Sequence, residues 1–100
     1  ERRIVIGPVV LDSNTYTVSR GEQVLELPKK EFELLYKLLS YPGQIFTRNQ
    51  LLDDIWGFDS ESGEDTVKTH ISRLRNKLRA IEEFRIITIK GLGYKAEVLE

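Results

Sequence analysis

The segment from residue 66 to residue 79, Thr-Val-Lys-Thr-His-Ile-Ser-Arg-Leu-Arg-Asn-Lys-Leu-Arg, is the part of the chain best suited to bind an anion. It holds five of the fifteen Lys and Arg residues and none of the sixteen Asp and Glu residues. Guanidinium, ammonium and hydroxyl groups mixed in this way suit the phosphates and base edges of a nucleic acid. Because the whole chain has a net charge of -1, the positive field must be confined to one side of the molecule.

The same segment has the apolar periodicity of a helix. Its apolar residues recur at steps of four, three, four and three and so form one stripe: Val67, Ile71, Leu74, Leu78 and Ile81. Polar residues project away from the stripe or flank it: Thr66, Thr69, His70, Arg73 and Asn76 lie opposite, and Lys68, Arg75, Lys77 and Arg79 lie beside it. A helix buried on one side and cationic on the other predicts insertion into the major groove of DNA.

The residues that catalysis or metal binding would need are scarce. The chain has one His and no Cys, and the acidic pairs Asp53-Asp54 and Glu82-Glu83 would point their side chains in different directions on a helix. Residues 91–96 formally match G-x-G-x-x-A, but the four residues that follow are too few for the helix that a dinucleotide site requires. We therefore expect no enzyme, no metal and no cofactor.

The length and composition indicate one domain over residues 1–100. Forty per cent of the 100 residues are hydrophobic, which is enough for one compact core. The absence of cysteine is compatible with a reducing compartment, and no apolar run approaches the roughly 20 residues of a membrane span. The charged start does not lead into a signal peptide. These features predict a cytoplasmic location.

The basic helix needs neighbours that cover its apolar stripe. Short strands are predicted at 4–6, 9–11, 15–19 and 23–27, followed by a helix through Phe32, Leu35, Tyr36 and Leu39 that ends before Pro42. Thr47 and Gln50 form a capping box for a second helix, which would bury Leu51, Leu52, Ile55 and Trp56 and end at Gly57 in a left-handed conformation. An acidic loop at 58–65, the basic helix at about 64–79, and a hairpin of strands 86–90 and 94–99 complete the order.

This order predicts an α+β fold, a winged helix-turn-helix with an N-terminal four-stranded antiparallel sheet, three helices and a C-terminal β-hairpin wing. The chain resembles the OmpR/PhoB-type effector domain of bacterial two-component response regulators in five motifs. They are Leu-Pro-Lys-Lys-Glu-Phe-Glu-Leu-Leu at 27–35, Pro-Gly-Gln-Ile-Phe-Thr-Arg-Asn-Gln-Leu-Leu at 42–52, Ile-Trp-Gly at 55–57, Thr-Val-Lys-Thr-His-Ile-Ser-Arg-Leu-Arg-Asn-Lys-Leu at 66–78 and Lys-Gly-Leu-Gly-Tyr at 90–94.

The resemblance implies sequence-specific binding of double-stranded DNA and regulation of transcription. It implies base contacts by Thr69 and Arg73, and contacts to the DNA backbone or at the wing (residues 86–98, near the minor groove) by Arg48, Thr66, Lys68, His70, Arg75, Lys77 and Lys90. It also implies an RNA polymerase contact in the loop by Asp59, Glu61 and Glu64. The implied partners are direct-repeat half-sites bound by a head-to-tail dimer, RNA polymerase, a receiver domain absent from this chain, and a sensor histidine kinase that acts on that receiver.

Three positions depart from the pattern of that family. Asp65 stands where Arg is common, which places a negative charge near DNA and lowers the expected affinity. Lys90 replaces an Arg of the wing, and an ammonium lacks the planar fork that favours a narrow minor groove. Pro28 replaces the hydroxyl residue that commonly caps the first helix, which breaks a capping box with Glu31.

Several alternatives remain open at this point. The cationic helix face could be only solvated, or could dock an acidic protein in an interaction module built on the same scaffold. His70 could be a hydrogen-bonded structural residue instead of a DNA contact, and the acidic loop could be a solvated connector. Trp56 is expected to belong to the core because it extends the apolar stripe of the second helix.

Overall fold

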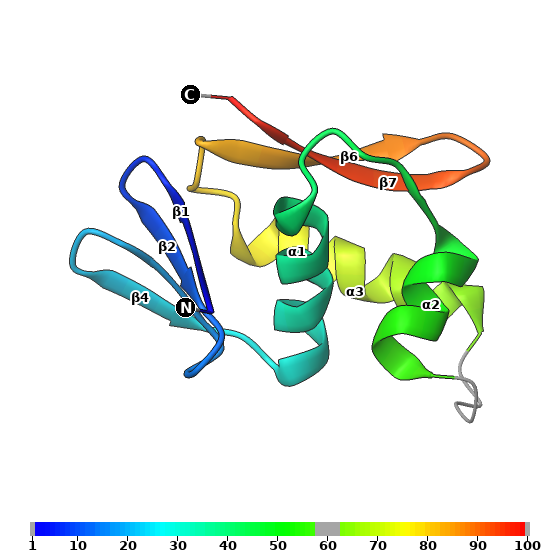
Figure 1. Ribbon diagram of the computed structural model, residues 1–100, viewed down its shortest axis with the longest axis horizontal. Helices are drawn as coiled ribbons and strands as arrows, with labels where there is room; N and C mark the ends of the chain where they lie inside the picture. The colour runs from blue at the N-terminus through cyan, green and yellow to red at the C-terminus, as the bar shows by residue number, and fades with distance from the viewer. Residues whose placement is uncertain (1, 58–62, 100) are drawn as a thin grey trace.

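Four short strands at the amino end form an antiparallel sheet (Figure 1). The computed structural model describes residues 2–57 and 63–99. In chain order the strands are β1 (Arg3–Ile6), β2 (Val9–Asp12), β3 (Thr17–Arg20) and β4 (Gln23–Glu26), and each pairs with the next. Leu11 lies opposite Ile4 and Val18, so one face of the sheet is apolar and covers the core. The predicted meander is confirmed.

The third strand begins two residues later than its sequence pattern predicts. The side chain of Asp12 accepts a hydrogen bond from the backbone N–H of Asn14, and its carbonyl oxygen accepts one from the backbone N–H of Thr15. These bonds close a turn through residues that otherwise favour a strand, as Asp commonly does. Local turn chemistry therefore takes precedence over strand propensity at Thr15.

Three helices follow, α1 (Lys29–Ser40), α2 (Arg48–Trp56) and α3 (Glu64–Lys77). The capping box of α2 is confirmed: Thr47 Oγ1 accepts from the N–H of Gln50, and Gln50 Oε1 accepts from the N–H of Thr47. α2 ends at Gly57, whose φ of 85° is positive as predicted. Pro28 occupies the N-cap of α1 without a side-chain hydrogen bond, so the loss of that capping box is also confirmed.

A second, three-stranded sheet has the order β5-β7-β6 and consists of β5 (Phe46–Thr47), β6 (Phe84–Ile89) and β7 (Gly93–Val98). Strands β6 and β7 are the predicted hairpin, whereas β5 was not predicted because it is two residues long. It pairs with the start of β7 beside Gly93, where an added Cβ would lie 1.9 Å from the carbonyl oxygen of Phe46. Gly93 thus permits a close approach of two backbones, and this packing accounts for the glycine at that position.

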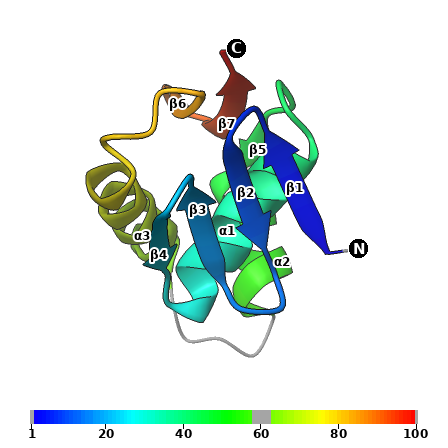
Figure 2. The same cartoon turned by 90° about the vertical axis from the view of Figure 1, so that its left-hand side faces the viewer.

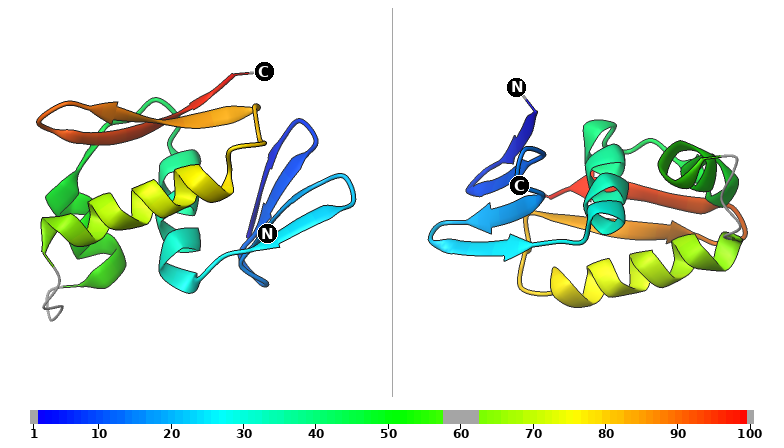
Figure 3. Two further views of the ribbon diagram at one scale, coloured as in Figure 1. Left: turned by 180° about the vertical axis from the view of Figure 1, so that it is seen from behind. Right: turned by 90° about the horizontal axis from the view of Figure 1, so that it is seen from below.

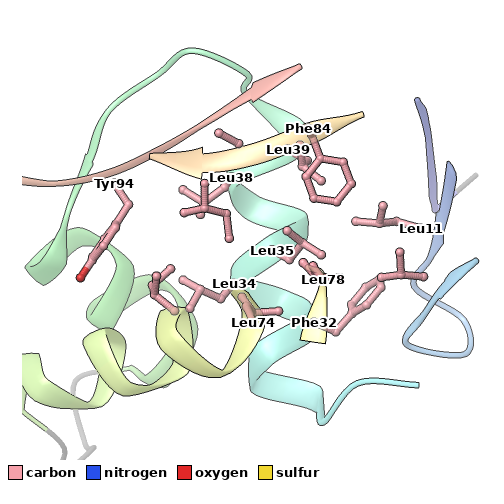
Figure 4. Close-up of a cluster of buried hydrophobic side chains, with 14 of the residues drawn as sticks. Leu11, Phe32, Leu34, Leu35, Leu38, Leu39, Leu74, Leu78, Phe84 and Tyr94 are labelled. Atoms are coloured by element: carbon pink, nitrogen blue, oxygen red, sulfur yellow. The ribbon is translucent and has the colours of Figure 1, made fainter. Parts of the chain in front are cut away.

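α1 lies at the centre of the molecule. The N-terminal sheet covers one side of it (Figure 2), while the hairpin and α3 lie on others. Leu34, Leu35 and Leu38 of α1 are fully buried, and Figure 4 shows them between the hairpin and α3. The predicted apolar stripe of this helix is confirmed, although Tyr36 is only half-buried. Within the described residues, no helix is both long and apolar enough to cross a membrane.

Candidate nucleic-acid interface

α3 is amphipathic in the manner that its sequence predicts. Val67, Ile71 and Leu74 are each at most 1% exposed, because they pack into the core against the other helices. Thr69 and Arg73 lie on the opposite side and are exposed. Figure 3 (left) shows α3 at the front of the molecule with the hairpin running alongside it. The third helix therefore offers a long polar face next to the β-hairpin.

The helix begins earlier than the end of the predicted loop. Gly63 is the N-cap, and Glu64 and Asp65 form the start of the first turn. Acidic residues at the amino end of a helix stabilise it, because the unpaired N–H groups there carry a partial positive charge. The start of the helix predicted at about residue 64 is therefore confirmed, and the loop predicted at 58–65 is wrong for its last two residues. Asp59 and Glu61 lie outside the described residues, as does the side chain of Glu64.

The side chains of Arg73 and Lys68 are oriented toward solvent. Within residues 2–57 and 63–99, neither the guanidinium of Arg73 nor the ammonium of Lys68 has a hydrogen bond or an ion pair. Both residues are exposed, and Thr69 lies between them in sequence on the outward side of α3. An unpaired guanidinium beside a hydroxyl group is chemically able to bind the O6 and N7 acceptors of a guanine.

Arg75 has a different arrangement, because it ties α3 to the hairpin. Its Nη2 donates to the carbonyl oxygen of Ile86 at 2.9 Å and to Thr88 Oγ1 at 2.8 Å. The guanidinium also lies over the ring of Tyr94, with 5.9 Å between the guanidinium carbon and the ring centroid. These contacts hold the helix and the wing in a fixed relation to each other.

Lys77 ties α3 to α1 in a similar way. Its Nζ lies 2.7 Å from Oε1 of Glu31, a residue that is only 2% exposed. A phosphate that captured Lys77 would leave this carboxylate buried without a counter-charge, and such states are strongly unfavourable. Lys77 therefore neutralises an internal acid. The burial of Glu31 was not predicted from the sequence, because its charge gives no indication of it. The available signal was the helical spacing of Glu31 to Leu34 and Leu35, which are fully buried.

His70 is part of the packing between α2 and α3. Its Nδ1 lies 2.8 Å from the carbonyl oxygen of Thr66, which can only accept, so Nδ1 carries the hydrogen. Its ring packs edge-on against Trp56 with 4.9 Å between centroids. These contacts support the structural alternative for His70. Trp56 is half-buried and packs against the core without being fully enclosed by it.

The wing places a further cation at the end of the hairpin. Lys90 precedes Gly91, whose φ of 75° allows the chain to reverse between β6 and β7. Lys90 is exposed and makes no ion pair with any residue in the described part of the chain. At the start of α2, Arg48 is half-buried, and Thr66 is half-buried in the first turn of α3. Most of the predicted site residues on the described elements therefore fall into two groups. Lys68, Thr69, Arg73 and Lys90 are exposed, whereas His70, Arg75 and Lys77 contact other groups of the domain itself.

Comparison with known proteins points to one family. A family model described as "Transcriptional regulatory protein, C terminal" matches residues 21–96. The heme response regulator HssR of Staphylococcus saprophyticus subsp. saprophyticus is 42% identical over 95 residues, which are 94% of this chain and 42% of that protein. This chain therefore spans less than half the length of that relative.

Two solved structures are similar over nearly the whole chain. The DNA-binding domain of the response regulator AdeR, in complex with an intercistronic region, has a TM-score of 0.80 and 26% identity over 96% of this chain and 100% of that one. The DNA-binding domain of Klebsiella pneumoniae RstA, in complex with the RstA box, has a TM-score of 0.80 and 31% identity over 97% of this chain and 98% of that one.

Proposed function

Because this chain belongs to the OmpR/PhoB-type family of transcriptional regulatory protein C-terminal domains, we propose that it binds double-stranded DNA sequence-specifically and regulates transcription. The observation that carries the proposal is the outward face of α3, where Arg73 and Thr69 are exposed while the opposite stripe is buried. Two similar domains were solved in complexes with an intercistronic region and with the RstA box. Those complexes support DNA binding by this chain.

In the proposed complex, α3 enters the major groove and the wing lies near the minor groove. Arg73 donates to a guanine, and Thr69 offers its methyl or hydroxyl group to a neighbouring base edge. Phosphate contacts come from Lys68, from Thr66 at the start of α3, from Arg48 at the start of α2 and from Lys90 at the wing. His70, Arg75 and Lys77, which the resemblance also places at the DNA backbone, act mainly by holding α3 in position.

The proposal extends to the longer protein that the relatives suggest. A receiver domain, phosphorylated by a sensor histidine kinase, would control this output domain. Two copies would bind direct-repeat half-sites head to tail, and the work would take place in the bacterial cytoplasm. The segment around Asp59, Glu61 and Glu64 would contact RNA polymerase.

Selection from random duplex DNA tests the proposed function. The purified chain is mixed with a random pool, bound duplexes are recovered over several rounds, and affinity for the enriched sequence is compared with affinity for a scrambled version. A DNA reader enriches one motif and binds it at least tenfold more tightly than the scrambled duplex. An acidic-protein docking module would instead show weak attraction that does not depend on sequence, and that result would contradict the proposal.

The polymerase contact needs a separate experiment. Charge reversal at Glu61 and Glu64 should leave the affinity for the selected duplex unchanged and lower the transcript yield in a purified transcription reaction. The matched control is Glu22→Lys, in the exposed turn between β3 and β4. Equal yields from the loop variant and the parent would support the solvated-connector alternative.

A further inference from the structure

Asp65 lies on the face of α3 that the proposed function uses. It is exposed in the first turn of the helix, four residues before Thr69 and eight before Arg73, which places all three on the side opposite the buried stripe. In the described part of the chain, its carboxylate has no hydrogen bond and no ion pair. A negative charge without a partner among residues 2–57 and 63–99 thus stands at one end of the outward row. The guanidinium of Arg73, also without a partner there, stands two turns further along.

A carboxylate in the major groove has few partners. Guanine presents two acceptors there, and thymine presents an acceptor and a methyl group, so both repel or fail to bind an anion. Adenine offers an amino group beside the N7 acceptor. Cytosine offers its N4 amino group alone, which makes it the base best matched to a group that only accepts.

We propose that Asp65 is a specificity-determining residue that selects cytosine by accepting a hydrogen bond from its N4 amino group. The inference rests on the proposed DNA binding and adds a second reading position to it. Residues at the amino end of a recognition helix are those that approach base edges most closely. Asp65 therefore reads a cytosine at one end of the half-site, and Arg73 reads a guanine further along.

The distance between the two residues predicts the distance between the two bases. Eight residues of α-helix span about 12 Å at a rise of ~1.5 Å per residue. Base pairs are stacked about 3.4 Å apart, so the two positions should differ by roughly three to four base pairs when the helix follows the groove. Because Asp65 and Arg73 have opposite charges and select different bases, the two ends of the half-site should differ in sequence.

Asp65 also has a simpler explanation, which the experiment must separate from the proposal. An acidic residue in a first turn is favoured by the helix dipole alone. In that case Asp65 would only repel phosphates, and its removal would strengthen binding to every duplex by the same factor. If Asp65 instead selects a base, its removal would change the base preference at one position of the motif only.

The test is selection from random duplex DNA with the parent, Asp65→Ala and Asp65→Asn. Glu22→Gln removes the same unit of charge from the turn between β3 and β4 and is the control. For Asp65→Ala we expect the preference for cytosine to fall about fivefold or more at a single position of the motif. That position should lie about three to four base pairs from the position at which Arg73→Lys changes the preferred base. For Asp65→Asn we expect that position to change from cytosine to adenine, because an amide pairs with the N6 and N7 edge of adenine.

The possible results are distinct. Loss of one preference in Asp65→Ala, with a cytosine-to-adenine change in Asp65→Asn and an unaltered motif for Glu22→Gln, supports the inference. An unaltered motif in both Asp65 variants, with uniformly tighter binding, overturns it and leaves the proposed function intact. Absence of any enriched motif for the parent itself overturns the proposed function, and this inference with it.

Discussion

The ammonium of Lys77 in α3 lies 2.7 Å from the carboxylate of Glu31 in α1, and that carboxylate is almost completely buried. The basic side chains of α3 are therefore of two kinds. Lys77 and Arg75 bind groups of the domain itself, whereas Arg73 and Lys68 have no partner among the described residues. The first kind sets the orientation of the helix, and the second kind is available to a ligand.

The pair between Lys77 and Glu31 predicts a loss of stability. Lys77→Met leaves a buried carboxylate without its partner, and we expect the free energy of unfolding to fall by about 2–3 kcal/mol, somewhat less than for a fully enclosed pair because Lys77 is partly exposed. Urea denaturation measures this, with Lys68→Met as the exposed control. Adding Glu31→Gln to Lys77→Met should restore part of the loss. Equal midpoints for the two single lysine variants would show that the pair does not stabilise the fold.

The contacts of Arg75 predict coupling between α3 and the wing. Arg75→Gln should lower the free energy of unfolding by about 1–2 kcal/mol, because the carbonyl of Ile86 and the hydroxyl of Thr88 lose a charged donor. Thr88→Val removes only one of those acceptors. In a double-mutant cycle the two substitutions should be less than additive, since they share one hydrogen bond. Strict additivity would mean that Arg75 and Thr88 do not interact in solution.

Much of the fold could be predicted because its signals are local and periodic. The stripe of Val67, Ile71 and Leu74, the capping box at Thr47 and the positive φ at Gly57 each depend on residues within a few positions of one another. Strand β5 could not be predicted in this way. Its two residues pair with β7 more than forty positions away, and only the packed fold brings them together.

The site was predictable in part for the same reason. The exposure of Arg73 follows from its place on the helix, whereas the partners of Lys77 and Arg75 depend on tertiary contacts. A helical pattern gives the side of a helix on which a cation lies. It does not indicate that an acid 46 residues earlier in the sequence is buried within reach.

Lys90 predicts a change in the salt dependence of DNA binding. Each phosphate contact contributes about 0.9 to the slope of the logarithm of affinity against the logarithm of salt concentration. Lys90→Ala should therefore reduce that slope by about one unit while leaving base preferences unaltered. Fluorescence anisotropy on the selected duplex measures this slope between about 50 and 200 mM salt, a range over which phosphate contacts change the affinity strongly. A slope equal to that of the parent would remove Lys90 from the contacts.

Arg20 and Glu83 predict a pH dependence of stability. Two guanidinium nitrogens of Arg20 donate to the carboxylate of Glu83, and the hydrogen bonding lowers the pKa of that carboxyl group. Such a lowered pKa stabilises the folded state at pH values above the pKa of the unfolded chain, which is about 4.3 for Glu. The stabilisation is lost as the pH falls through the pKa of the folded state. The denaturation midpoint of Glu83→Gln should thus fall below that of the parent at neutral pH and converge with it in acid. A difference that is constant with pH would contradict this account.

The central claim is that the guanidinium of Arg73 reads a base from the outward face of α3. Arg73→Lys keeps the charge but loses the planar pair of donors, so it separates base reading from attraction to phosphate. The decisive measurement is the ratio of affinities for the selected and scrambled duplexes, compared between parent and Arg73→Lys. We expect this ratio to fall by about fivefold or more, with little change in the affinity for the scrambled duplex. An unchanged ratio, in a variant whose unfolding midpoint equals that of the parent, would contradict it.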